Sequence, residues 1–158
     1  EERTWLEPAQ VFAKVEANRK KQVEEVSATL MVQPDLPRLR VHPTRLFQLL
    51  DNFMSNALQA LGGRGGRRIW FGFGSPCGQE AFFIEDDGPG IEPGLQEKVF
   101  GAFFRQDRSS PGAGIGLTIA SRVMESYGGR IWLEQGRTGG ARFCFCFGSD
   151  CHEVLEKA

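Results

Sequence analysis

The chain has 158 residues, of which 41% are hydrophobic and 25% charged, proportions typical of one ordinary globular domain. A formal net charge of −1 gives no electrostatic basis for binding nucleic acid. No apolar run approaches the roughly 18 residues that cross a bilayer, so we expect no direct membrane contact. The cysteines show no C-x-x-C spacing, which favours reduced, packed thiols over a metal site built from Cys144, Cys146, Cys151 and His152.

The first half of the chain predicts two helices and one strand. Apolar residues at helical spacing follow Pro8, which indicates a helix over residues 8–21. A run over residues 26–32, ended by prolines, predicts a strand. From Pro43 to the glycine pair at 62–63, the apolar residues repeat with the 3.6-residue period of an amphipathic helix.

The second half predicts two hairpins with a helix between them. Residues 69–73 and 81–85 form the first hairpin, around the turn-forming residues 75–78, and residues 130–135 and 141–147 form the second, around the glycine-rich residues 136–140. The helix covers residues 115–127. Three helices against one mixed, mostly antiparallel sheet of about five strands predict a two-layer α/β sandwich, with residues 1–158 in a single domain.

A carboxylate opens the glycine-rich run D-D-G-P-G that follows the strand over residues 81–85. At the end of a strand, Asp86 can accept a hydrogen bond from the 6-amino group of adenine, worth about 1.5–3 kcal/mol, whereas it would repel the carbonyl oxygen of guanine. Glycine at positions 88 and 90 lets the backbone approach a ligand closely. Taken alone, the same run is compatible with an ordinary β-turn.

A second glycine-rich run, G-A-G-I-G, begins at Gly112 and opens the predicted helix. Backbone N–H groups at a helix N-terminus bind phosphate oxygens, and the helix dipole favours negative charge there. No Gly-Lys-Ser or Gly-Lys-Thr follows, which rules out a Walker loop. The polar residues 105–111 predict a lid hinged at Gly101 and Gly112 that closes over phosphates, with Arg105 and Arg108 either contacting them or forming solvated surface.

Two asparagines, Asn52 and Asn56, stand one helical turn apart on the helix that begins at Pro43. Their amide oxygens are neutral, hard donors that suit a Mg²⁺ ion whose other ligands are water and phosphate. The alternative is a pair of solvated or capping amides. An amide cannot act as a general base near neutral pH, so neither residue can activate a water molecule by removing its proton.

The order of amide pair, carboxylate, aromatic segment and glycine turn resembles the catalytic, ATP-binding domain of sensor histidine kinases. That family belongs to a superfamily with the gyrase, Hsp90 and MutL ATPases, and the likeness covers residues 5–148, nearly the whole chain. It implies a Bergerat-type sandwich with three helices on one face, and ATP and Mg²⁺ as cofactors. It further implies transfer of the ATP γ-phosphate to a histidine of a two-component system.

The resemblance also assigns roles to individual residues. Asp86 reads adenine above the turn formed by Gly88 and Gly90, while Asn56 binds Mg²⁺ with the help of Asn52, and the two asparagines are the candidate catalytic residues. The implied nucleotide site consists of Asn56, Asp86, Gly88, Gly90, Ile91, Phe104, Arg105, Arg108, Gly112, Gly114, Ile115, Gly116 and Leu117.

The residue type at position 52 distinguishes between the possible activities. In the hydrolysing relatives and the serine kinases of the superfamily, glutamate holds this position and can activate a water or a hydroxyl group. The amide of Asn52 favours transfer to a histidine, which is nucleophilic when neutral. The alternatives are a superfamily ATPase or serine kinase, and a degenerate module that binds nucleotide for regulation.

The resemblance implies an acceptor histidine outside this chain. His42 precedes Pro43 at a helix start and is interpreted as a cap, and His152 has only six residues after it. The implied partners are therefore a histidine-containing helical dimerisation domain, which this chain lacks, and a response regulator. We expect the isolated domain to be monomeric and cytoplasmic, whether or not a parent protein is anchored in a membrane.

Overall fold

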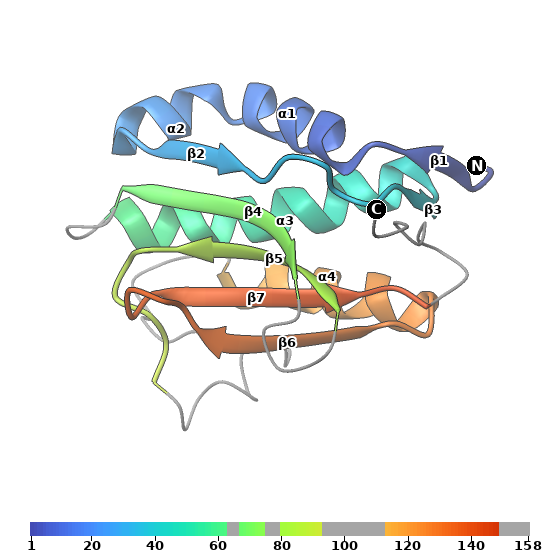
Figure 1. The fold of residues 1–158 in the computed structure, drawn as a ribbon. Helices are drawn as coiled ribbons and strands as arrows, with labels where there is room; N and C mark the ends of the chain where they lie inside the picture. Colours follow the sequence, from blue (N-terminus) through green and yellow to red (C-terminus); the bar gives the residue numbers. More distant parts are fainter. Residues whose placement is uncertain (63–66, 75–79, 93–112, 149–158) are drawn as a thin grey trace.

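The computed structural model describes residues 1–62, 67–74, 80–92 and 113–148, with residues 113–116 described by their backbone alone. The described helices and the main sheet form two layers, as predicted (Figure 1). In chain order the elements are β1 Thr4–Leu6, α1 Pro8–Asn18, α2 Lys20–Val26, β2 Thr29–Val32, β3 Leu39–Val41, α3 Pro43–Gly62, β4 Arg68–Gly74, β5 Ala81–Asp86, α4 Ala113–Ser126, β6 Arg130–Gln135 and β7 Ala141–Cys146.

The main sheet has the strand order β2-β4-β5-β7-β6. Strands β2 and β4 are parallel, and the other neighbouring pairs are antiparallel. The prediction of a mixed, mostly antiparallel sheet and of both hairpins is therefore confirmed. A second, two-stranded sheet pairs β1 with β3. Neither strand was predicted, because three residues are too few to display the two-residue alternation of a strand.

The central helix α3 packs against the other three described helices and against β5. Its buried residues follow the helical period, as predicted: Leu46, Leu49, Leu50, Phe53, Met54, Ala57, Leu58 and Leu61. The ring of Phe53 stacks on those of Phe143 and Phe145 in β7, with ring centroids 5.4 and 5.5 Å apart, which joins the two layers. Within the described residues, no helix is both long and apolar enough to cross a membrane.

The expectation of three helices is corrected to four described helices, because the predicted helix 8–21 divides at Arg19. That residue has φ −113° and ψ 21°, and its guanidinium donates to both carboxylate oxygens of Asp51 at 2.6 and 2.9 Å. The helix α2 then continues to Val26, so β2 is shorter than the predicted strand 26–32. Since α2 buries no residue completely, it has no apolar stripe from which the sequence could reveal it.

His42 precedes α3, but its side chain contacts Tyr127, the residue that follows α4, rather than the end of its own helix. The Tyr127 hydroxyl accepts from the backbone N–H of His42 at 2.9 Å and is hydrogen-bonded to ring atom Nδ1. The cap is supplied instead by Glu1, whose carboxylate accepts from the backbone N–H and the hydroxyl of Thr44 at 2.8 and 2.7 Å. His42 does stand at the cap position, as interpreted, because its carbonyl oxygen accepts from the backbone N–H groups of Arg45 and Leu46 at 3.0 and 3.2 Å, but its side chain takes no part in the cap.

Candidate functional site

Asp86 ends β5, with its side chain on the same face as the core residues Phe82 and Ile84. It is almost fully buried, and its Oδ1 atom accepts from the backbone N–H groups of Gly88 at 2.9 Å and Ala141 at 3.5 Å. Burial raises the pKa of the Asp86 carboxyl from 3.8 to about 6, against the lowering effect of these two hydrogen bonds. Two hydrogen bonds therefore hold Oδ1 in place. Because the carboxyl is poorly solvated, any further hydrogen bond that it accepts is strengthened.

The loop after β5 passes close to the C-terminal part of α3. A Cβ atom at Gly88 would lie 3.2 Å from the carbonyl oxygen of Ala60 and 3.0 Å from Asp86 Oδ1. Gly90 has φ +77°, and a Cβ there would overlap the carbonyl oxygen of Gly139. Both positions therefore require glycine, one for close packing on α3 and the other for its backbone conformation.

The asparagine pair lies on the same side of α3 as Ala60, since residues 52, 56 and 60 follow one another at intervals of four. Both asparagine side chains are partly exposed, and Asn56 Nδ2 donates to the backbone carbonyl of Asn52 at 2.7 Å. This bond engages the NH₂ group of the Asn56 amide, so the acceptor that the side chain can offer is Oδ1. The neutral oxygen is a donor of the kind that Mg²⁺ accepts, so the local chemistry fits the predicted metal.

The helix α4 begins at Ala113, so the backbone of Gly114, Ile115 and Gly116 forms its first turn, and the helix packs on α3. Leu117 is buried in the core, and Ile91 packs against the core at its edge. Backbone N–H groups at the start of a helix are suited to binding phosphate, the role predicted for this turn. The remaining predicted residues of the nucleotide site, Phe104, Arg105, Arg108 and Gly112, lie outside the described residues, as does the predicted lid.

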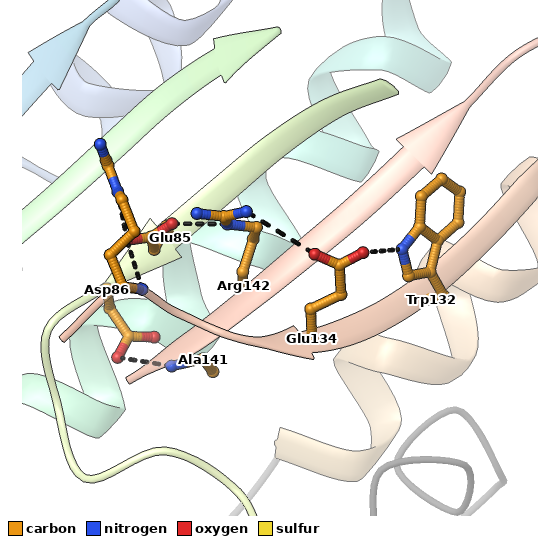
Figure 2. Close-up of polar contacts among 7 residues, drawn as sticks. Glu85, Asp86, Trp132, Glu134, Ala141 and Arg142 are labelled. Carbon is orange, nitrogen blue, oxygen red and sulfur yellow. Dashed lines mark hydrogen bonds and ion pairs between the residues drawn. The ribbon is translucent and has the colours of Figure 1, made fainter. Parts of the chain in front are cut away.

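A network of charged side chains lies behind Asp86, on the face of the sheet opposite the described helices, here called the outer face. Glu85 is fully buried and binds two arginines: Arg142 Nε lies 2.6 Å from Oε1, and Arg137 Nε lies 3.3 Å from Oε2. Arg142 Nη1 also lies 3.6 Å from Glu134 Oε2. The Glu134 carboxylate in turn accepts from the indole N–H of Trp132 at 2.8 Å. Figure 2 shows this chain of contacts from β5 across β7 to β6.

Sequence reasoning did not find this network. Two signals were available: strand alternation places Glu85 and Asp86 on opposite faces of the sheet, and the predicted last hairpin carries one arginine in its turn and another just after it. The pairing of Glu85 with Arg142 depends on the register between β5 and β7, which the sequence does not specify.

The described cysteines agree with the packing interpretation. Cys144 is buried, and Cys146 is half-buried on the same strand. Among the described residues, no group of three or more His, Cys, Asp or Glu side chains is arranged to hold a metal ion. Cys151 and His152 lie outside those residues.

Comparison with known families places these features in one class of protein. The model of the family described as Histidine kinase-, DNA gyrase B-, and HSP90-like ATPase matches residues 41–150, more than half of the chain. The chain therefore belongs to this family, which confirms the resemblance on which the sequence analysis relied. The matched range contains both asparagines, Asp86 and α4.

Several of the individual matches are named as histidine kinases. The methanogenesis regulatory histidine kinase FilI of Methanothrix harundinacea is 42% identical over 99 residues, which cover 62% of this chain and 11% of the relative. The nucleotide-free catalytic domain of histidine kinase ThkA superposes with a TM-score of 0.72 at 26% identity, covering 92% of this chain and 95% of that one. This chain thus spans about a tenth of FilI and nearly all of the ThkA catalytic domain.

Two larger similar structures are complexes, one with a nucleotide analogue and one with a partner protein. Full-length ShkA, in complex with AMPPNP, matches with a TM-score of 0.73 and 26% identity over 90% of this chain and 30% of that chain. ThkA in complex with the response regulator TrrA matches with a TM-score of 0.70 and 26% identity over 90% of this chain and 40% of that chain.

Proposed function

We propose that this chain is the ATP- and Mg²⁺-binding catalytic domain of a two-component sensor histidine kinase. The observation that carries the proposal is Asp86, a buried carboxylate at a strand end whose two backbone donors both bind Oδ1. Among the described residues this leaves Oδ2 for an external donor. The 6-amino group of adenine supplies one, whereas the 6-carbonyl group of guanine would meet a repelling oxygen.

The polyphosphate would extend from this base towards α3 and the start of α4. Asn56, assisted by Asn52, would hold Mg²⁺ through amide oxygen and water, and the N–H groups around Gly114 would bind phosphate oxygens. Bound Mg²⁺ supplies positive charge that stabilises the reacting phosphates. The AMPPNP complex of the related ShkA supports a nucleotide site of this kind.

The acceptor would be a histidine on a separate helical domain. A neutral imidazole nitrogen attacks the γ-phosphorus, the bond from phosphorus to the bridging oxygen breaks, and ADP leaves. Because the Asn52 amide cannot remove a proton, this site favours a nucleophile that needs no such help over water. A response regulator would then receive the phosphoryl group, a proposal supported by the complex of the related ThkA with TrrA.

Calorimetric titration with AMPPNP, with Mg²⁺ and with a chelator, tests the proposal. We expect the chain to bind, Asp86→Asn to lose about tenfold or more in affinity under both conditions, and Asn56→Ala to lose only the part that depends on Mg²⁺. Gln48→Ala is the matched control, because it removes an amide from the other end of α3. No binding by the unaltered chain would reject the proposal.

A second measurement separates kinase from ATPase. With labelled ATP and a helical acceptor domain, we expect label on the acceptor histidine and little release of phosphate by the chain alone. Steady hydrolysis over many turnovers without an acceptor would instead support a superfamily ATPase.

A further inference from the structure

The turn between β6 and β7 is anchored at both ends by one carboxylate on the outer face. Glu85 Oε2 accepts from the backbone N–H and the Nε of Arg137, each at 3.3 Å, while Oε1 accepts from Nε of Arg142 at 2.6 Å. Arg137 stands at the start of the turn, and Arg142 follows its end in register with Glu85. The Arg137 guanidinium also lies over the Trp70 ring, 5.3 Å from the centroid, which adds a contact with β4.

The end of the same turn also contacts Asp86, whose side chain lies on the other face of the sheet. Its ends are joined by a hydrogen bond from Gly136 N–H to the Gly140 carbonyl at 2.7 Å. Gly140 packs directly on the Asp86 backbone, since a Cβ there would overlap the Asp86 carbonyl oxygen. Ala141, the next residue, donates its N–H to Asp86 Oδ1. The turn is therefore the physical link between two adjacent carboxylates whose side chains point to opposite faces (Figure 2).

We infer that Glu85 is a positioning residue for Asp86: by anchoring the 136–140 turn from the outer face, it places the Ala141 N–H that holds Oδ1 and so directs Oδ2 towards the ligand. This inference rests on the proposed function, because the ligand of Oδ2 is taken to be an adenine amino group. Glu85 itself contacts neither the base nor the phosphates. Its effect passes through Arg137, the turn and Ala141.

The network contains its own matched control. Glu134 also binds Arg142, at 3.6 Å, but it lies on β6, one strand further from Asp86, and accepts from Trp132, whereas the bonds from Arg137 of the turn go to Glu85. Removing the charge of Glu134 therefore perturbs the same arginine without releasing the turn. The substitution Glu85→Gln is more disruptive, because the new NH₂ group faces N–H donors of Arg137 or Arg142.

The test compares the affinities for ATP and for inosine triphosphate, which carries a carbonyl oxygen in place of the 6-amino group. Titrations without Mg²⁺ are made on the unaltered chain, Glu85→Gln and Glu134→Gln. We expect Glu85→Gln to lower the preference for ATP about tenfold, and Glu134→Gln to change it less than about twofold. A purely structural role of Glu85 would lower the melting temperature and leave the preference unchanged.

The outcomes distinguish this inference from the proposed function. If the unaltered chain shows no preference for ATP, the adenine assignment of Asp86 fails and this inference fails with it. If the unaltered chain prefers ATP and Glu85→Gln keeps that preference, the positioning role alone is wrong.

A second variant keeps the inference testable if Glu85→Gln does not fold. Arg137→Ala removes a side chain that is 60% exposed but keeps the backbone N–H that binds Glu85, so we expect this variant to fold. We expect the preference for ATP to fall about threefold and hydrogen exchange at the Ala141 amide to accelerate. Unchanged preference together with unchanged exchange would overturn the inference.

Discussion

Glu85 and Asp86 are adjacent, buried carboxylates at the end of β5, yet the protein treats their charges differently. On the outer face, Glu85 lies between two arginines, and its charge is balanced within the protein. On the opposite face, which the helices cover, the donors to Asp86 among the described residues are backbone N–H groups, and burial raises its pKa to about 6. Strand alternation thus separates a charge balanced within the protein from one that, in the proposed function, binds the ligand.

The largest expected effect comes from removing the balanced charge. Glu85→Leu leaves Arg142 without its nearest carboxylate in a site that is largely buried, and we expect a loss of about 3–5 kcal/mol in the free energy of unfolding. Urea denaturation measures it. The double variant Glu85→Leu with Arg142→Leu should recover part of the loss, because no orphaned charge then remains. A loss below about 1 kcal/mol would show that the pair is solvated.

The second effect is a dependence of stability on pH that arises from Asp86. Between pH 3.8 and about 6, the folded chain holds the Asp86 proton more tightly than the unfolded chain does. Stability from this group is therefore greatest below pH 3.8, declines as the pH rises, and is lost above about pH 6. The full change corresponds to about 3 kcal/mol.

Asp86→Asn is the control for that dependence, because the amide does not titrate. Urea unfolding of both proteins is measured at pH 4.5 and pH 7. We expect the stability of the unaltered chain relative to the variant to fall by about 2 kcal/mol over this interval. A constant difference between the two proteins would mean that the Asp86 carboxyl is solvated in the folded state.

The contrast between the two carboxylates also shows what sequence can predict. The helix α3 and both hairpins were predicted well, because they have long, regular apolar patterns in which local propensity and burial favour the same structure. The helix α2 and the short strands β1 and β3 were missed, because they bury little or are too short for a period. The break at Arg19 depends on an ion pair with Asp51, a contact between residues far apart in sequence.

The site divides in the same way. Asp86, the glycines at 88 and 90 and the asparagine pair were found because each belongs to a short motif whose spacing carries its chemistry. Their assigned roles stay predictions, as do those of Phe104, Arg105 and Arg108. Glu85 was missed because its meaning depends on strand register and on the turn between β6 and β7. No local pattern encodes those relations.

A third and smaller effect should appear in binding. If Oδ2 of Asp86 accepts from the adenine amino group, a proton on the carboxyl removes that acceptor. With a pKa of about 6, we expect affinity for AMPPNP to fall about tenfold from pH 7 to pH 5. Phosphate ionisation also changes in this range, but it affects Asp86→Asn equally. The ratio of the two affinities therefore isolates Asp86, and a ratio independent of pH would contradict this role.

The smallest effect lies at the far end of the outer-face network. Trp132→Phe keeps an aromatic ring beside Arg130 but removes the indole N–H that donates to Glu134. We expect a loss of about 1 kcal/mol in urea unfolding and no change in the preference for ATP over inosine triphosphate. Trp5→Phe, at an exposed indole on β1, is the matched control and should change neither. Because Arg142 keeps Glu85 in this variant, the turn stays anchored. A changed nucleotide preference would mean that the whole network, and not Glu85 in particular, determines the orientation of Asp86.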